Sequence, residues 1–183
     1  QQSATGKKLN KPSDDPAAMG PVLSYQVKGE STQRYLNHVK TAGGEMELLD
    51  TELGHVENLL TKARETGIAA LNGAATEADR QTYADQISQL HDEILQTANR
   101  QTNGRYVFAG YKERTAPFTK NGGYLPADYD PADSSTWPVT YQGDENAKTV
   151  AIAPGKSIQV GLTGSQLFLG DADNDQVVDS GGS

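Results

Sequence analysis

A Gly-Lys-Ser triplet is the first feature of this sequence that could do chemistry. Gly155-Lys156-Ser157 matches the end of a phosphate-binding loop. In that loop the first glycine lies five residues earlier, where this chain has Val150, and a helix must follow the serine. Here an alternating strand pattern follows instead. We therefore expect a β-turn at the triplet and no nucleotide site.

Metal ligands are the second possibility. His38, His55 and His91 all fall on predicted helices, but no two have the i, i+4 spacing of a zinc-binding pair. The chain has no cysteine, which excludes disulfides, thiolate metal sites and a cysteine nucleophile. We expect the histidines to lie at the surface or beside a helical seam.

Three aspartates near the end of the chain have calcium-loop spacing. Asp171, Asp173 and Asp175 match the first three ligands, but Gln176 replaces the glycine and Gly182 replaces the bidentate glutamate. We expect an acidic, solvated turn, and keep a calcium- or glycan-binding surface module as a remote alternative. No nucleophile motif is present, so we expect no enzyme activity and no cofactor or metal.

Charge and composition favour long helices over a deep globular core and argue against nucleic-acid binding. The net charge is −8, and residues 121–183 carry 2 basic against 9 acidic side chains. Nucleic-acid binding needs clustered lysine and arginine, so we expect no nucleic-acid partner. Apolar residues make up 35% of the chain and aromatic residues 7%, which suits long helices with narrow apolar stripes. No apolar run is long enough to cross a bilayer, and we expect no membrane partner.

Two long helices must position whatever surface this chain presents. The first is predicted from about Asp15 to Leu71, with Pro16 at the first helical position and a possible break at Gly43-Gly44. Apolar residues spaced alternately by 3 and 4 predict a coiled-coil-like seam along it. That seam comprises Met46, Leu49, Leu53, Val56 and Leu60.

The second helix is predicted from a Thr76 cap to about Arg100, with Asp79 in the capping-box position. A matching seam runs along it, made of Tyr83, Ile87, Leu90 and Ile94. A short turn between two seamed helices predicts an antiparallel pair.

The residue pattern of the remaining chain predicts β structure. Strand-forming residues at 106–108 and a return segment ending near Phe118 predict a hairpin. Residues 119–136 have the composition of a loop, and further strands are predicted at 137–141, 149–152 and 158–162. In the last strand, alternation places Ile158, Val160 and Leu162 on one face. The fold class is therefore α+β.

We expect a helical rod domain with a leading loop and a hairpin over residues 1–118. Residues 119–183 are expected to begin a smaller, acidic, β-rich outer domain, with a linker-like tail from Gly170.

Three stretches resemble the flagellins and hook-associated proteins of bacterial flagella. Residues 5–18 (TGKKLNKPSDDPAA) resemble the segment that opens the rod domain of this family, and residues 103–110 (NGRYVFAG) resemble the hairpin after its second rod helix. The form of residues 105–110 is most similar to the hook-filament junction members. Residues 141–144 (YQGD) and the run to 163–165 (TGS) are similar to the start of their outer β-domain.

The resemblance implies a structural adaptor that joins the hook to the filament outside the cell. Its implied partners are other copies of itself in a ring, the neighbouring hook-associated junction protein, flagellin and an export chaperone. It also implies that the chain is a central fragment, beginning after the first terminal helix of the family and ending before the last. A true flagellin that builds the filament itself is the alternative within the family.

The same resemblance suggests where neighbouring subunits pack: the leading loop and the hairpin. The implied contact residues are Asn10, Pro12, Ser13, Asp14, Asp15, Asn103, Gly104, Arg105, Tyr106 and Phe108.

Overall fold

The structure is a computed structural model that describes residues 16–170 of the chain, with side chains from Met19 onward. Contacts divide these residues into two compact units, which we describe separately. One unit contains residues 16–41 and 150–158, and the other contains residues 42–149 and 159–170. The elements in order are α2 (Pro16–Ala70), α3 (Glu77–Ala98), β1 (Gln101–Thr102), β2 (Arg105–Tyr106), β3 (Phe118–Lys120), β4 (Val139–Tyr141), β5 (Thr149–Ala153) and β6 (Lys156–Gln159).

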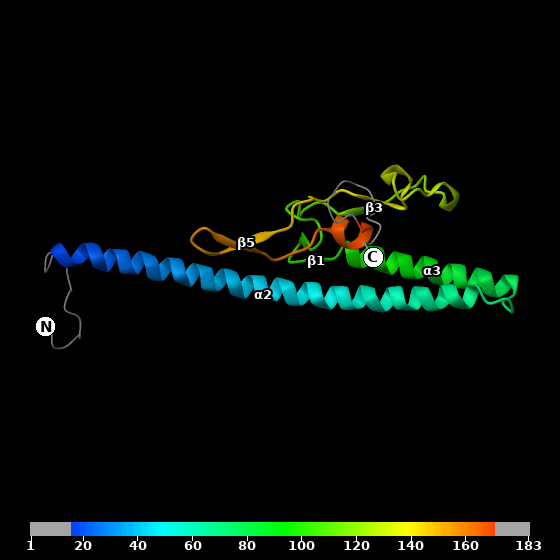
Figure 1. Cartoon of the computed structure of the whole chain (residues 1–183), viewed down its shortest axis with the longest axis horizontal. Coiled ribbons are helices and arrows are strands. Elements are labelled where there is room, and N and C mark those ends of the chain that lie inside the picture. The colour runs from blue at the N-terminus through cyan, green and yellow to red at the C-terminus, as the bar shows by residue number, and fades with distance from the viewer. Residues whose placement is uncertain (1–15, 171–183) are drawn as a thin grey trace. The chain divides into compact units, whose positions relative to one another are not determined.

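Helix α2 is continuous over 55 residues (Figure 1), which confirms the single long helix predicted from the sequence. It starts at Pro16 and runs through Pro21 and through Gly43-Gly44, where a break had been considered. A β-carbon at either of these glycines would meet no neighbouring atom within 4 Å, so no close packing requires them. The predicted cap at Asp15 lies outside the described residues.

Helix α3 begins with the predicted capping box. The Asp79 N–H donates to the Thr76 hydroxyl oxygen at 3.2 Å, and the Asp79 carboxylate accepts from the Thr76 N–H at 2.9 Å. Two N–H groups that the first turn leaves unpaired are thereby satisfied. Hydrogen bonds from the side chain and main chain of Thr76 hold the pKa of Asp79 below its usual value.

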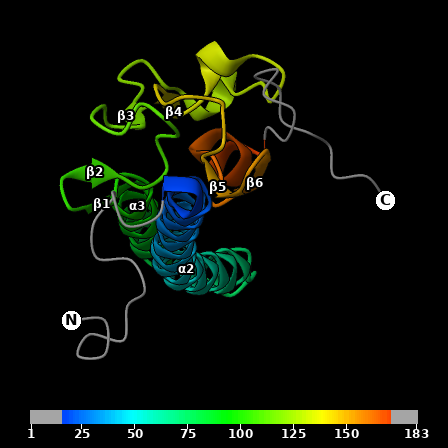
Figure 2. The ribbon, with the colours of Figure 1, turned by 90° about the vertical axis from the view of Figure 1, so that its left-hand side faces the viewer.

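The second unit pairs α3 with the C-terminal half of α2 in antiparallel fashion (Figures 1 and 2). Two side-chain contacts join α2 to α3 and to the residues just after it: His55 Nε2 lies 3.3 Å from Glu93 Oε1, and Arg100 Nε lies 3.4 Å from Glu52 Oε1. Residue numbers rise along α2 as they fall along α3, which confirms the antiparallel pair.

The predicted hairpin exists, but its strand pairing is different. Strand β2 pairs with β1, in the register Gln101 with Tyr106 and Thr102 with Arg105. The turn residues Asn103 and Gly104 both have positive φ, at 53° and 74°. These values fit a type I′ turn, whose twist matches that of the strands and which favours Asn-Gly. The return strand predicted to end near Phe118 is therefore wrong.

Phe118 instead begins β3, which pairs antiparallel with β4. The amide of Asn99, just after α3, fixes the start of this strand. Its Nδ2 donates to the Phe118 carbonyl and its Oδ1 accepts from the Phe118 N–H, both at 2.9 Å. Between the two strands lies the predicted loop, with short 3-10 turns at Pro126–Asp128 and Ser134–Thr136.

The core of the non-helical part of the second unit is a cluster of four aromatic rings. Phe108 packs edge-on against Phe168 with centroids 5.1 Å apart, and Phe118 lies 5.5 Å from Phe168 and 5.2 Å from Tyr141. Gly164 allows this packing, because a β-carbon there would lie 2.7–2.8 Å from ring carbons of Phe118 and Tyr141.

The first unit places the β5–β6 pair beside α2, where His38 Nδ1 lies 3.0 Å from the Ala151 carbonyl oxygen. The predicted turn at the Gly-Lys-Ser triplet is confirmed, with Gly155 at a φ of 67°. Strand β6 spans Lys156–Gln159, so the predicted strand 158–162 begins two residues too late and ends three residues too late. Its single apolar face is also wrong: Ile158 and Leu162 are about 40% exposed, whereas Val160 in the second unit is buried.

Candidate subunit-packing surface

The β1–β2 hairpin carries four of the five predicted contact residues that the structure describes. Asn103, Gly104 and Arg105 are exposed, and the Arg105 side chain is 68% accessible. Tyr106 is half-buried. The tip of the hairpin is therefore the most exposed part of the predicted contact set that the structure describes.

Phe108 is a correction to the predicted contact set. Its side chain is fully buried, and its carbonyl accepts hydrogen bonds from the Tyr141 hydroxyl at 3.1 Å and the Gly164 N–H at 2.9 Å. The aromatic cluster formed with Phe168 explains this burial, since a contact 60 positions along the chain leaves no local trace in the sequence. The remaining predicted contacts, Asn10, Pro12, Ser13, Asp14 and Asp15, lie outside the described residues.

Glu113 forms two ion pairs, one of which anchors Arg105 at the start of β2. One carboxylate oxygen lies 3.1 Å from Arg105 Nη1 and the other 2.5 Å from Lys148 Nζ. The hydrogen bond from Lys148, with a smaller contribution from Arg105, keeps the pKa of Glu113 below its usual value. The Glu113 carbonyl also accepts from the Tyr106 N–H at 2.8 Å. Arg105 is thus exposed but oriented.

The predicted seam is unevenly buried. Val56 is buried, whereas Leu49, Leu53, Tyr83, Leu90 and Ile94 are half-buried. Met46, Leu60 and Ile87 are 51%, 55% and 37% exposed. Leu59, which the predicted stripe omits, is only 1% exposed. Adjacent leucines at 59 and 60 both suit a helical period, and the side on which α3 lies decides which one is covered.

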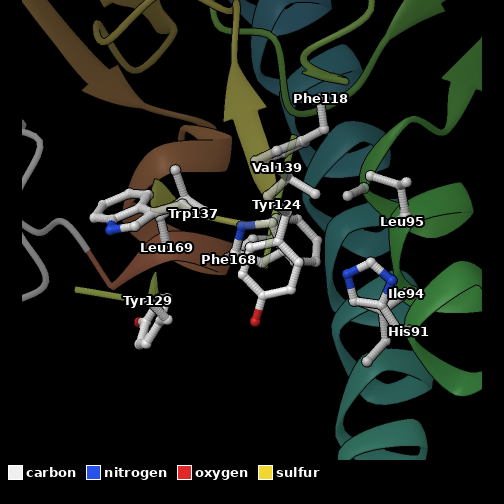
Figure 3. A pocket seen from close by; sticks show the side chains of 12 residues that line it. His91, Ile94, Leu95, Phe118, Tyr124, Tyr129, Trp137, Val139, Phe168 and Leu169 are labelled. Carbon is white, nitrogen blue, oxygen red and sulfur yellow. The ribbon is translucent and has the colours of Figure 1, made fainter. Parts of the chain in front are cut away.

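An apolar pocket of about 340 Å³ lies between α3 and the β3–β4 segment (Figure 3). His91, Ile94 and Leu95 line it from the helix, facing Tyr124 and Trp137 across the opening. The Trp137 indole N–H donates to the Asp130 carbonyl at 3.1 Å, so this ring is anchored to the loop. The lining offers no group of acids and bases arranged for catalysis.

Residues 16–170 hold no group of three or more metal-ligating side chains. Within the same range, none of the helices is long and apolar enough to cross a bilayer. His55 and His91 instead lie near carboxylates, at 3.3 Å from Glu93 and 3.5 Å from Asp92. The aspartates with calcium-loop spacing, Asp171, Asp173 and Asp175, lie outside the described residues.

The family model for the "bacterial flagellin N-terminal helical region" matches residues 1–113. The chain belongs to the flagellin family. This assignment agrees with the resemblance at residues 5–18 and 103–110.

Relatives of this flagellin-family chain include the flagellar hook-associated protein 3 of Salmonella typhimurium, 31% identical over 170 residues. That match covers 92% of the chain and 48% of the relative, so the chain spans about half the length of this protein. The flagellar filament 41 kDa core protein of Borreliella burgdorferi is 30% identical over 106 residues, covering 54% of the chain and 30% of that protein. The crystal structure of hook-associated protein 3 from Legionella pneumophila superposes with a TM-score of 0.68 at 25% identity, covering 79% of the chain and 40% of that structure. The α+β fold is that of this family.

Three of the family-like segments of this flagellin-family chain meet at one place: residues 103–110, 141–144 and 163–165. The Asp144 N–H donates to the Ala109 carbonyl at 2.9 Å, and the Tyr141 hydroxyl lies 2.9 Å from the Asp144 carbonyl oxygen. The Gly164 N–H donates to the Phe108 carbonyl. Burial raises the pKa of Tyr141 to about 12, so its hydroxyl stays protonated and can donate. Residues 141–144 and 163–165 therefore bind the segment at Phe108 and Ala109 that directly follows the hairpin.

Sequence reasoning missed the residues that support the hairpin rather than form it. Asn99, Glu113 and Gly164 were not singled out, although each contacts segments distant in the sequence. The Asn103-Gly104 pair is a local signal for the type I′ turn, because this turn favours Asn-Gly at its two central positions.

Proposed function

We propose that this chain is part of a structural subunit of the bacterial flagellum that joins the hook to the filament. The supporting observation is the extent of the match to hook-associated protein 3. It covers 92% of the chain and so continues into the β-containing part beyond residue 113, where the family model ends. The match to a filament core protein covers only 54%.

The proposal includes the partners of such a junction: other copies of the same subunit in a ring, the neighbouring hook-associated protein, and flagellin. It places the protein outside the cell after export, with a chaperone bound before export. Residues 119–183 serve as the start of an outer domain, and the subunit performs no catalysis. The apolar pocket and the ion pairs of the second unit are structural on this account.

The hairpin tip, made of Asn103, Gly104 and Arg105, is the proposed contact with a neighbouring subunit. Two properties of Arg105 support this proposal. Its guanidinium is oriented by the ion pair with Glu113, and 68% of its side chain is still accessible. Arg105→Ala is expected to reduce incorporation into flagella while changing the melting temperature little, since exposed ion pairs contribute about 0–1 kcal/mol. Arg114→Ala, at an exposed arginine in the same segment, is the matched control.

A flagellin-type filament subunit is the second candidate, supported by the 30% identity to the Borreliella filament protein over 106 residues. Position in the flagellum separates the two. Immunogold labelling of purified hook-filament preparations is expected to mark one short zone where hook and filament meet. Labelling along the whole filament would instead assign the protein to the filament and overturn the junction proposal.

A further inference from the structure

We propose that Asn103 is a site of spontaneous main-chain modification, through attack of the Gly104 nitrogen on its side-chain amide. An asparagine followed by glycine is prone to this reaction because no side chain on the glycine shields its amide nitrogen. The chain has three such pairs, at Asn72, Asn103 and Asn121. Their surroundings in the structure differ, and this difference predicts which one reacts first.

Asn103 is the least restrained of the three. It is exposed at the tip of a hairpin whose strands are two residues each. Within the described residues, neither its side chain nor the Gly104 N–H has a hydrogen-bond partner. No atom of the fold lies within 4 Å of the β-carbon position at Gly104, so the turn has room to change shape. A tip with so few contacts opens at low cost in free energy.

Asn121 is the opposite case. Its Nδ2 donates to the carbonyls of Ser135 and Trp137, at 3.0 and 3.1 Å, and its Oδ1 accepts from the Gly123 N–H at 3.0 Å. These three bonds restrain the side-chain amide, so it must break them before it can turn toward the Gly122 nitrogen. Asn72 is intermediate, since its Oδ1 accepts one bond, from the Ala74 N–H at 3.1 Å.

The reaction balances with water as the only co-reactant. The Gly104 nitrogen loses its proton and forms a bond to Cγ of Asn103, and the bond from Cγ to the amide nitrogen breaks, which releases ammonia. Water then opens the resulting cyclic imide at either carbonyl. The product at position 103 is an aspartyl or an isoaspartyl residue, and the isoaspartyl form carries one extra carbon in the main chain.

Both products would alter the hairpin tip. A carboxylate at position 103 lies two residues from Arg105 and competes with Glu113 for its guanidinium. An extra main-chain carbon does not fit a two-residue type I′ turn, which fixes the register of the strands. The modification is independent of the proposed junction function, because it depends only on the local geometry.

The test is peptide mapping of the purified chain after incubation for days at 37 °C and pH 8. Trypsin separates the three sites, since cleavage at arginine and lysine gives peptides 65–80, 101–105 and 121–148. The mass change from amide to acid, with isoaspartyl methyltransferase labelling, reports each site. Peptide 101–105 is expected to convert about tenfold or more faster than peptide 121–148, because three hydrogen bonds protect Asn121.

Incubation of the same chain in concentrated urea is the control. There the folded environment is lost, and the two sites are expected to convert at similar rates. The variant Asn103→Gln is expected to abolish conversion in peptide 101–105. Equal rates at Asn103 and Asn121 in the folded chain would overturn the proposal, as would a difference of the same size in urea.

Discussion

Glycine residues help to position the candidate surface, as charged residues do. Gly164 is an example, because its missing side chain leaves room for the rings of Phe118 and Tyr141 while its N–H binds Phe108. Those contacts hold the segment that follows the hairpin. The position of the segment after the hairpin therefore depends on the close packing at Gly164, which the sequence of the hairpin itself does not indicate.

Gly164→Ala is expected to destabilise the fold by about 1–3 kcal/mol, the usual cost of overpacking a core. Its β-carbon would lie within 3 Å of two rings, which are too rigid to move aside easily. Urea unfolding measures the loss. Gly161→Ala is the matched control, since the nearest atom to its β-carbon is 4.0 Å away. Equal stability of the two variants would contradict the packing account.

The ion pairs of Glu113 predict a pH dependence. Lys148 and Arg105 lower the pKa of Glu113 below its ordinary value of 4.5 in the folded chain. The unfolded chain therefore binds a proton more readily, and the contribution of Glu113 to stability is present above pH 4.5. It disappears as the pH falls through the lower, folded pKa.

The variant Glu113→Gln tests this expectation through urea unfolding at a series of pH values. It is expected to be less stable than the original chain at pH 7, with a difference that shrinks below pH 4.5. Glu45→Gln, at an exposed glutamate on α2 without an ion pair among the described residues, is expected to show no such trend. A constant difference across the whole pH range would rule out the proposed cause.

Helix α2 is continuous through Gly43-Gly44, where the helix propensity of the sequence is low. Gly43-Gly44 lies next to the boundary between the two contact units, at residues 41 and 42, yet the helix runs through it. Glycine lowers helix stability because it leaves more conformational freedom in the unfolded chain. The element is therefore stable in spite of this pair.

Gly43→Ala and Gly44→Ala are each expected to raise the free energy of unfolding by about 1 kcal/mol, from helix propensity alone. Both β-carbons would enter open space. The opposite sign is expected for Gly155→Ala, which also has open space but a φ of 67°. Thermal unfolding followed by circular dichroism measures all three. A loss of stability at Gly43 or Gly44 would show that α2 bends there.

The starts of the helices were easier to predict from the sequence than the pairing of the strands and the burial of side chains. Pro16 and the Thr76 capping box gave both helix starts, because helix ends depend on residues within one turn. The partner of β2, the burial of Phe108 and the choice of Leu59 over Leu60 were not predicted. Each of these depends on a segment far along the chain. Of the candidate surface, only the exposed tip at residues 103–105 could be found from local signals.

At the scale of the whole molecule, the chain has a flagellin-family fold. It covers 48% of hook-associated protein 3 from Salmonella and 40% of the Legionella crystal structure. The described residues supply an antiparallel helix pair and a hairpin held by an aromatic core, with the exposed tip as the proposed subunit contact. These features suit a subunit that works by packing against its neighbours.

Deletion of the gene tests the junction proposal most directly, with flagellin in the culture medium as the measurement. Without a hook-filament adaptor, flagellin is expected to leave the cell unassembled, so that it accumulates in the medium while hooks remain on the cells. Restoring the gene is expected to return the filaments. Normal filaments on the deletion strain, with no rise in free flagellin, would contradict the proposal.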